Sequence, residues 1–157
     1  MRAPTAVLGL GNPIMTDEGI GVVLVQRLAE QGDAYPDVEF IDAGTSGMKL
    51  LHLLEGRAKA ILIDCAYMDE SPGTMRRFAY DDVESVKDLP DLSLHEGDLL
   101  QLLRLAKQLG TCPSEVIIFG IQPQELAPGH ALTETLGVKL DRYCQEIWAE
   151  LGPTAQP

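Results

Sequence analysis

Basic residues are scarce in this chain of 157 residues. Only 12 lysines and arginines stand against 24 aspartates and glutamates, giving a formal net charge of −12. A surface this acidic would repel a phosphate backbone, which argues against nucleic acid as a partner. A partner with a positively charged surface would suit it better.

Long apolar runs and paired cysteines are also lacking. No run is long enough for a membrane-spanning helix, and no separate apolar signal segment precedes the first strand pattern. The three cysteines, an odd number without metal-ligand spacing, fit a reducing compartment. There is no internal repeat. We therefore expect a cytoplasmic protein without membrane insertion, with a single domain over residues 1–151 and a flexible tail at 152–157.

Strand and helix patterns alternate along the chain. Strands are expected at residues 5–10, 38–41, 60–63 (ending at Asp64) and 116–121, with a possible edge strand at 75–80. Helices are expected at 18–31 and 133–151, and a short one is expected after the loop 42–47. A further helix should begin at the S-x-x-E capping box of Ser93 and end at Gly110. This order predicts an α/β fold, a single three-layer domain in which helices cover both faces of a mostly parallel sheet.

Glycines and two adjacent carboxylates follow the first strand pattern. In Gly9-Leu10-Gly11 and Asp17-Glu18-Gly19-Ile20-Gly21, the spacing lacks the third glycine of a dinucleotide fingerprint and the Gly-Lys-Ser/Thr of a phosphate loop. The segment is therefore interpreted as a strand, a loop and a helix that present a carboxylate. The alternative is a tight turn whose acidic residues complement a helix dipole.

Three potential metal ligands fall on one rim of the predicted sheet. Glu18 follows the first strand, Asp64 ends the third, and His95 lies in the first turn of the helix expected after Ser93. Ligands bind at the carboxyl ends of such strands, and this oxygen and nitrogen set suits a divalent first-row metal. Each residue also has a plainer interpretation, as a dipole-complementing glutamate, a capping aspartate and an exposed turn histidine.

The usual protease signatures are absent. No serine lies in G-x-S-x-G, and His95-Glu96 is not continued to H-E-x-x-H. Cys65 directly follows Asp64, but nearby carboxylates would raise its pKa, so a buried structural role is expected for it.

Several short motifs, taken in order, resemble those of the hydrogenase maturation proteases. They are Gly9-Leu10-Gly11-Asn12 with Asp17-Glu18-Gly19-Ile20-Gly21, Asp42-Ala43-Gly44-Thr45-Ser46-Gly47, Ile63-Asp64-Cys65-Ala66 with Pro72-Gly73-Thr74, Ser93-Leu94-His95, and Gly120-Ile121-Gln122-Pro123. The resemblance runs from about residue 5 to residue 150. It departs at Ala43, where many relatives carry glycine; alanine is tolerable there if φ is negative.

This resemblance implies a twisted sheet between helices and an endopeptidase of hydrogenase maturation. Such enzymes remove a C-terminal extension from the large-subunit precursor of a [NiFe] hydrogenase after nickel insertion. Glu18, Asp64 and His95 match the family's metal-contacting positions and are the expected catalytic residues. The metal would be the nickel of the substrate, for which another divalent metal could substitute.

Asp42 is the candidate substrate-binding residue. It opens the loop before Gly44 and could contact the precursor tail, or it could stabilise its own turn as an Asx residue. Two other functions stay open at this stage. One is a non-catalytic chaperone that binds the metal or the partner, and the other is a nucleotide-binding α/β domain.

Overall fold

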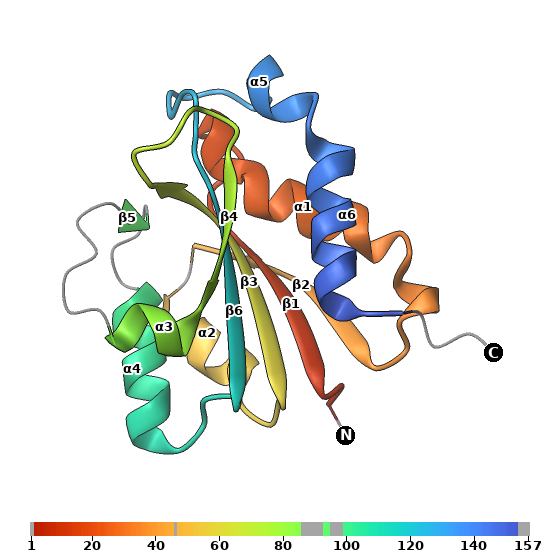
Figure 1. Cartoon of the computed structure of the whole chain (residues 1–157), viewed down its shortest axis with the longest axis vertical. Helices are drawn as coiled ribbons and strands as arrows, with labels where there is room; N and C mark the ends of the chain where they lie inside the picture. The colour runs from red at the N-terminus through yellow and green to blue at the C-terminus, as the bar shows by residue number, and fades with distance from the viewer. Residues whose placement is uncertain (1, 46, 86–92, 95–98, 154–157) are drawn as a thin grey trace.

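Short runs rich in valine, isoleucine and leucine form the centre of a sheet in the computed structural model, which describes residues 2–45, 47–85, 93–94 and 99–153 (Figure 1). The strands are β1 (Thr5–Leu10), β2 (Val38–Gly44), β3 (Lys59–Tyr67), β4 (Met75–Ala79), β5 (Ser93–Leu94) and β6 (Glu115–Ile121). Their order is β2-β1-β3-β6-β4, and β5 pairs with β3. Strands β2, β1, β3 and β6 are parallel, whereas β4 and β5 run antiparallel to their partners.

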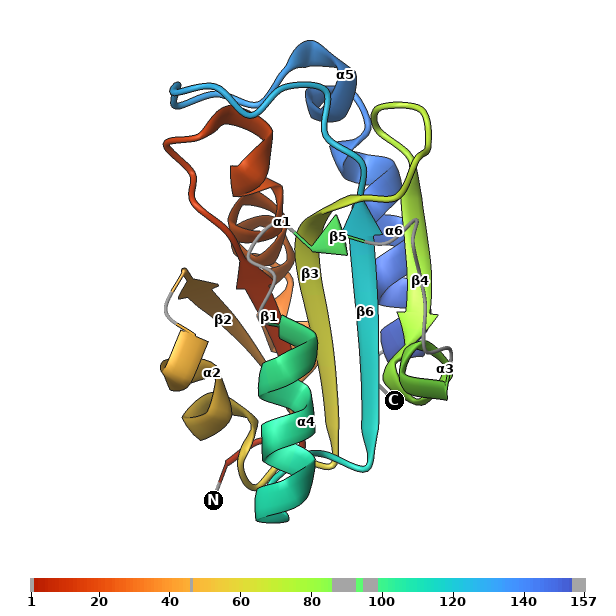
Figure 2. The same cartoon turned by 90° about the vertical axis from the view of Figure 1, so that its left-hand side faces the viewer.

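Helices cover both faces of this sheet (Figure 2). They are α1 (Ile20–Ala29), α2 (Gly47–Leu54), α3 (Tyr80–Ser85), α4 (Leu99–Leu109), α5 (Glu134–Gly137) and α6 (Leu140–Leu151), with 3-10 turns η1 (Thr16–Gly19) and η2 (Gly32–Ala34). Leucines of α2 and α4 are buried on one face, and apolar residues of α1 and α6 on the other. The predicted three-layer α/β architecture is therefore confirmed.

The chain reverses its direction of travel across the sheet at β1. It passes from β1 through α1 to β2 on one side, and then through α2 to β3 on the other side. Because α1 and α2 lie on opposite faces, the carboxyl ends of β1 and β3 flank a topological switch point. In open α/β sheets such a point is where ligands bind.

Two of the predicted strands were too short. Strand β3 does not end at Asp64 but continues to Tyr67, because its last two residues pair with β5. Strand β2 continues past residue 41 to Gly44, so Asp42 belongs to the strand rather than to a following loop. The expected edge strand is present as β4.

Three predicted helix boundaries were also wrong. The first helix begins at Ile20 and ends at Ala29, with Glu18 in the preceding turn η1. Ser93 lies in β5 and is not a helix cap, since it pairs with Tyr67; α4 begins at Leu99. The single helix expected at 133–151 is divided into α5 and α6.

The sequence predicted that the domain extends to residue 151 and that residues 152–157 form a flexible tail. Helix α6 ends at Leu151, and residues 154–157 lie outside the described part of the chain. Among the helices that the structure describes, none combines the length and the apolar character needed to cross a bilayer.

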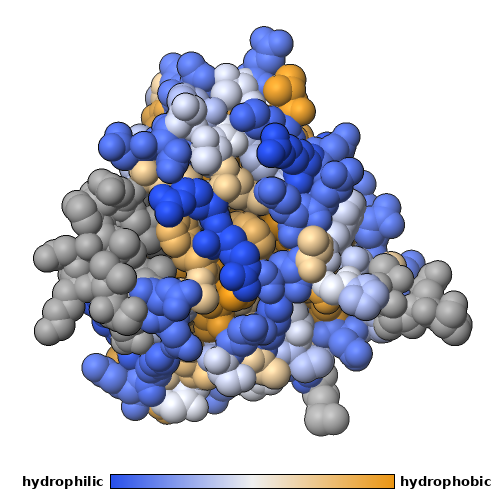
Figure 3. Space-filling model, in the orientation of Figure 1, coloured by the Kyte–Doolittle hydropathy of each residue, from blue (hydrophilic) through white to orange (hydrophobic). Residues whose placement is uncertain are grey.

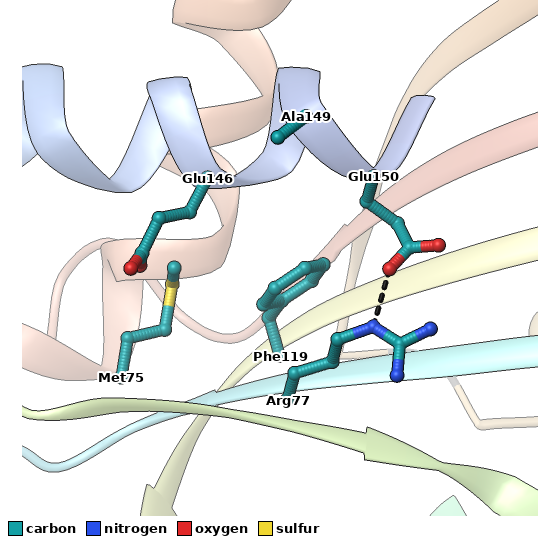
Figure 4. Close-up of a pocket in the computed structure, with 6 residues that line it drawn as sticks. All are labelled: Met75, Arg77, Phe119, Glu146, Ala149 and Glu150. Carbon is teal, nitrogen blue, oxygen red and sulfur yellow. Dashed lines mark hydrogen bonds and ion pairs between the residues drawn. The ribbon is translucent and has the colours of Figure 1, made fainter. Parts of the chain in front are cut away.

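A pocket of about 460 Å³ lies between the edge strand β4 and helix α6. Figure 3 shows apolar surface there with strongly hydrophilic side chains lying across it. The lining side chains include Phe119 and Met75, and the Arg77 guanidinium forms an ion pair with Glu150 across the opening (Figure 4). Lys59 Nζ lies 2.9 Å from the other oxygen of Glu150. The Glu150 carboxylate on α6 is thus paired with one cation from β3 and one from β4.

We expect Glu150→Gln to destabilise the protein by about 1–3 kcal/mol at pH 7, because Arg77 would lose its carboxylate partner and Lys59 would lose the less exposed of its two. The hydrogen bond from Arg77, and then Lys59, hold the pKa of Glu150 below its ordinary value. The stabilisation is therefore complete above the ordinary glutamate pKa and is lost as the pH falls through the lowered one. Urea denaturation at pH 7 and at acid pH measures both effects.

Glu115→Gln is the matched control for this prediction. Glu115 also contacts Lys59, at 3.3 Å, but its side chain is 54% exposed, against 13% for Glu150. An exposed ion pair of this kind contributes less than about 1 kcal/mol. Equal losses in the two variants would contradict the assignment of a stabilising role to Glu150.

Candidate functional site

The start of helix α1 is pressed against the carboxyl ends of β1 and β3. A Cβ added to Gly21 would lie 2.3 Å from the Ile63 carbonyl oxygen and 2.4 Å from that of Leu10. A Cβ on Gly9 would lie 2.2 Å from the Gly21 carbonyl oxygen. Only glycine allows this backbone approach, and it places the turn η1 at the switch point.

Turn η1 carries Glu18, whose backbone lies directly over the loop after β1. Gly11 has a φ of +123°, and a Cβ there would lie 2.0 Å from the Glu18 carbonyl oxygen. The Glu18 N–H donates to Met15 O at 3.1 Å. Glu18 itself is only 4% exposed. The glycines of the motif therefore bring a buried carboxylate to the ends of β1 and β3.

Asp64 lies in β3 at the end of its pairing with β1. The last pair of that ladder is Gly9 with Ile63, so Asp64 is the first residue of β3 beyond it. The Asp64 residue is 2% exposed, and its Oδ1 accepts a hydrogen bond from the Cys65 N–H at 2.8 Å. Asp64 and Glu18 thus approach the switch point from β3 and from the start of α1.

The pKa of the Cys65 thiol reflects the negative charge of this region. Its pKa is raised by burial, and further by the negative charges of Asp64, Asp17 and Glu18. All three carboxylates therefore lie close enough to act on one sulfur atom. A buried thiol held in its protonated form is a poor nucleophile, so the expected structural role of Cys65 is supported.

His95 lies outside the described residues. Its chain neighbour Leu94 pairs with Ala66, two residues after Asp64 in β3. Within residues 2–45, 47–85, 93–94 and 99–153, no three histidine, cysteine or acidic side chains form a group that could hold a metal ion. A complete ligand set in this region would need His95, another residue outside the described ranges, or a group supplied by another molecule.

Asp42 is exposed in β2, beside β1 in the sheet. Its Oδ1 accepts a hydrogen bond from the Gly44 N–H at 3.0 Å, which is the Asx arrangement weighed for it. Gly44 has a φ of +55°, whereas Ala43 has no positive φ, so alanine is accommodated there without strain.

The sequence pattern did not separate Asp17 from Glu18, but the structure does. Asp17 is fully buried, and its carboxylate accepts hydrogen bonds from residues 124–133, which follow β6. No local spacing could reveal these bonds, since the partners lie 107 to 116 residues away along the chain.

Exposed apolar side chains lie at the same rim of the sheet as the carboxylates. Ile14, Met48 and Tyr67 are 53%, 68% and 45% exposed. They follow or end β1, β2 and β3 at the same rim of the sheet. Large apolar side chains left in solvent around polar groups are typical of surfaces that bind another protein.

Comparison with known proteins agrees with this architecture. A family model described as hydrogenase maturation protease matches residues 22–150. The chain is 34% identical to the hydrogenase expression/formation protein HupD of Rhodobacter capsulatus, over 92% of this chain and 70% of that protein. It is 33% identical to the hydrogenase 2 maturation protease of Escherichia coli, over 92% of this chain and 88% of that protein.

A solved structure shares the fold over nearly the whole length. The hydrogenase maturating endopeptidase HybD from E. coli superposes with a TM-score of 0.78 at 30% identity, covering 96% of this chain and 92% of that one. With a family model that matches most of its residues and relatives above 30% identity, the chain belongs to the hydrogenase maturation protease family.

Proposed function

We propose that this protein is an endopeptidase that removes the C-terminal extension of a [NiFe] hydrogenase large-subunit precursor after nickel has been inserted. The observation that carries the proposal is the placement of two buried carboxylates, Glu18 and Asp64, at the ends of β1 and β3 that flank the switch point of a maturation-protease fold. The relatives, among them a hydrogenase 2 maturation protease and a hydrogenase maturating endopeptidase, support the class of reaction.

In this proposal Glu18, Asp64 and His95 contact the nickel of the substrate. Carboxylate oxygens and an imidazole nitrogen suit a divalent first-row metal. The pairing of Leu94 with Ala66 supports the choice of His95, because Leu94, the residue before His95, lies beside the end of β3. Metal held there could position the tail and polarise the scissile carbonyl or a water molecule. Another divalent metal could substitute for nickel.

The substrate is proposed to be a folded protein that covers the rim. Ile14, Met48 and Tyr67 offer exposed apolar contacts at the rim that carries the carboxylates. Asp42, exposed at the end of the neighbouring strand, is proposed to contact the tail of the precursor. Three free cysteines suit action in the reducing cytoplasm.

Cleavage of a precursor with and without nickel tests the proposal. The purified protein is mixed with the large-subunit precursor of its own host, and the mass of the precursor is measured. We expect loss of a C-terminal peptide from the nickel-loaded form alone. Loss from both forms would contradict the role of nickel. A complex with an intact, nickel-loaded precursor would favour the non-catalytic chaperone instead.

A further inference from the structure

The carboxylate of Asp17 binds a segment from the other end of the chain. Its Oδ2 accepts hydrogen bonds from the Gln124 N–H at 2.8 Å and the Glu125 N–H at 3.1 Å. Its Oδ1 accepts one from the Thr133 N–H at 2.9 Å, and the Thr133 hydroxyl lies 2.8–2.9 Å from both oxygens. A fully buried carboxylate is thus satisfied by neutral donors of residues 124–133.

Thr16 binds the same segment. Its N–H donates to Gly129 O at 3.0 Å, and its hydroxyl donates to Glu125 O at 2.7 Å. The Thr16 hydroxyl oxygen also accepts a hydrogen bond from the Ala127 N–H at 3.1 Å. Thr16 has a φ of +48°, in the left-handed region that disfavours a β-branched residue. The surrounding bonds hold this conformation. We call Thr16, Asp17 and residues 124–133 the Asp17 clamp. In Figure 2 residues 124–133 belong to the loop between β6 and α5, and Thr16 and Asp17 precede α1.

Helix capping does not account for Asp17. Neither turn η1 nor helix α1 has a side-chain hydrogen bond at its cap. The Asp17 oxygens accept instead from backbone and hydroxyl groups beyond β6. Asp17 and Glu18 therefore have different roles, although they are adjacent in one motif.

We infer that Asp17 is a positioning residue, which through the clamp fixes the turn that carries Glu18 relative to Asp64. This inference rests on the proposed function for its catalytic consequence. Glu18 follows Asp17 directly and takes its backbone direction from η1. The segment 124–133, which contributes no predicted ligand, thereby becomes part of the active site. A misplacement of about 1 Å in such a group can lower a rate by about 100-fold.

Thr133→Val is the preferred test of the inference. Asp17→Asn is less suitable, because its amide NH₂ would face backbone N–H donors and disrupt the fold of the turn. Valine removes the hydroxyl but retains the Thr133 N–H and a similar shape. Thr133→Ser restores the hydroxyl. Thr135→Val is the matched control, since it removes a hydroxyl of the same region whose bond goes to Gln124 Oε1 and not to Asp17.

Two measurements follow on these variants. We expect amide hydrogen exchange of Asp17 and Glu18 to be about tenfold faster in Thr133→Val, and unchanged in Thr133→Ser and Thr135→Val. We expect kcat on the nickel-loaded precursor to fall about tenfold in Thr133→Val, with a smaller change in KM, because Met48 and Tyr67, two of the proposed precursor contacts, lie outside the clamp.

Wild-type exchange in Thr133→Val would overturn the clamp. Faster exchange with an unchanged kcat would overturn the positioning role and leave Asp17 as a structural residue. A wild-type protein that cleaves no nickel-loaded precursor would overturn the proposed function instead, and the exchange data would still decide whether the clamp holds the turn.

Discussion

Glu18→Gln is expected to slow removal of the C-terminal extension by about 10³-fold, equivalent to about 4 kcal/mol of transition-state stabilisation. Glutamine has the shape of glutamate but lacks its charge and is a weaker metal ligand. Glu18 is 4% exposed at the ends of β1 and β3, where a substrate metal would meet it. Asp64→Asn should cause a similar loss and can retain the bond from the Cys65 N–H. Single-turnover cleavage followed by mass spectrometry measures both.

Two controls separate this effect from other causes. Glu134→Gln removes the same charge from an exposed position in α5 and should cleave at the wild-type rate. Cys65→Ala should also retain cleavage, because burial and the nearby carboxylates keep the thiol protonated. Normal cleavage by Glu18→Gln would remove that carboxylate from the mechanism, and loss of cleavage in Cys65→Ala would return the thiol to it.

Local patterns in the sequence were sufficient for most of the fold. The apolar runs of β1, β3 and β6 and the amphipathic stripes of α1 and α4 are properties of neighbouring residues, and they predicted a sheet covered on both faces. The local motif also predicted a carboxylate after the first strand, although Glu18 lies in the turn η1 and not in the helix. The family resemblance was confirmed by the comparisons.

The errors concern contacts between distant segments. Ser93-Leu94-His95-Glu96 matches a capping box, but pairing of Ser93 with Tyr67 places that residue in a strand. The same strand pair extends β3 beyond Asp64. The role of Asp17 was also missed, because its hydrogen-bond partners follow β6 and are distant in the sequence. Tertiary pairing overrides a local preference wherever the two compete.

Gly21→Ala is expected to destabilise the protein by at least about 3 kcal/mol, among the larger effects of a single methyl group. Its Cβ would meet the carbonyl oxygens of Ile63 and Leu10, which are fixed in the sheet and cannot turn aside as a side chain could. Helix α1 would have to move away from the ends of β1 and β3. Urea denaturation measures the loss.

Gly137→Ala distinguishes this steric effect from the general cost of losing a glycine. A Cβ at Gly137 meets no atom within 4 Å, and Gly137 ends α5 without a positive φ, so alanine there should raise stability by about 0.5 kcal/mol. Equal stability of Gly21→Ala and wild type would contradict the close approach of α1. Where the fold survives, the displaced helix also displaces η1, so cleavage should fall further than stability alone explains. The glycines of the first motif would then act on catalysis through the backbone that they allow, and not through any group of their own.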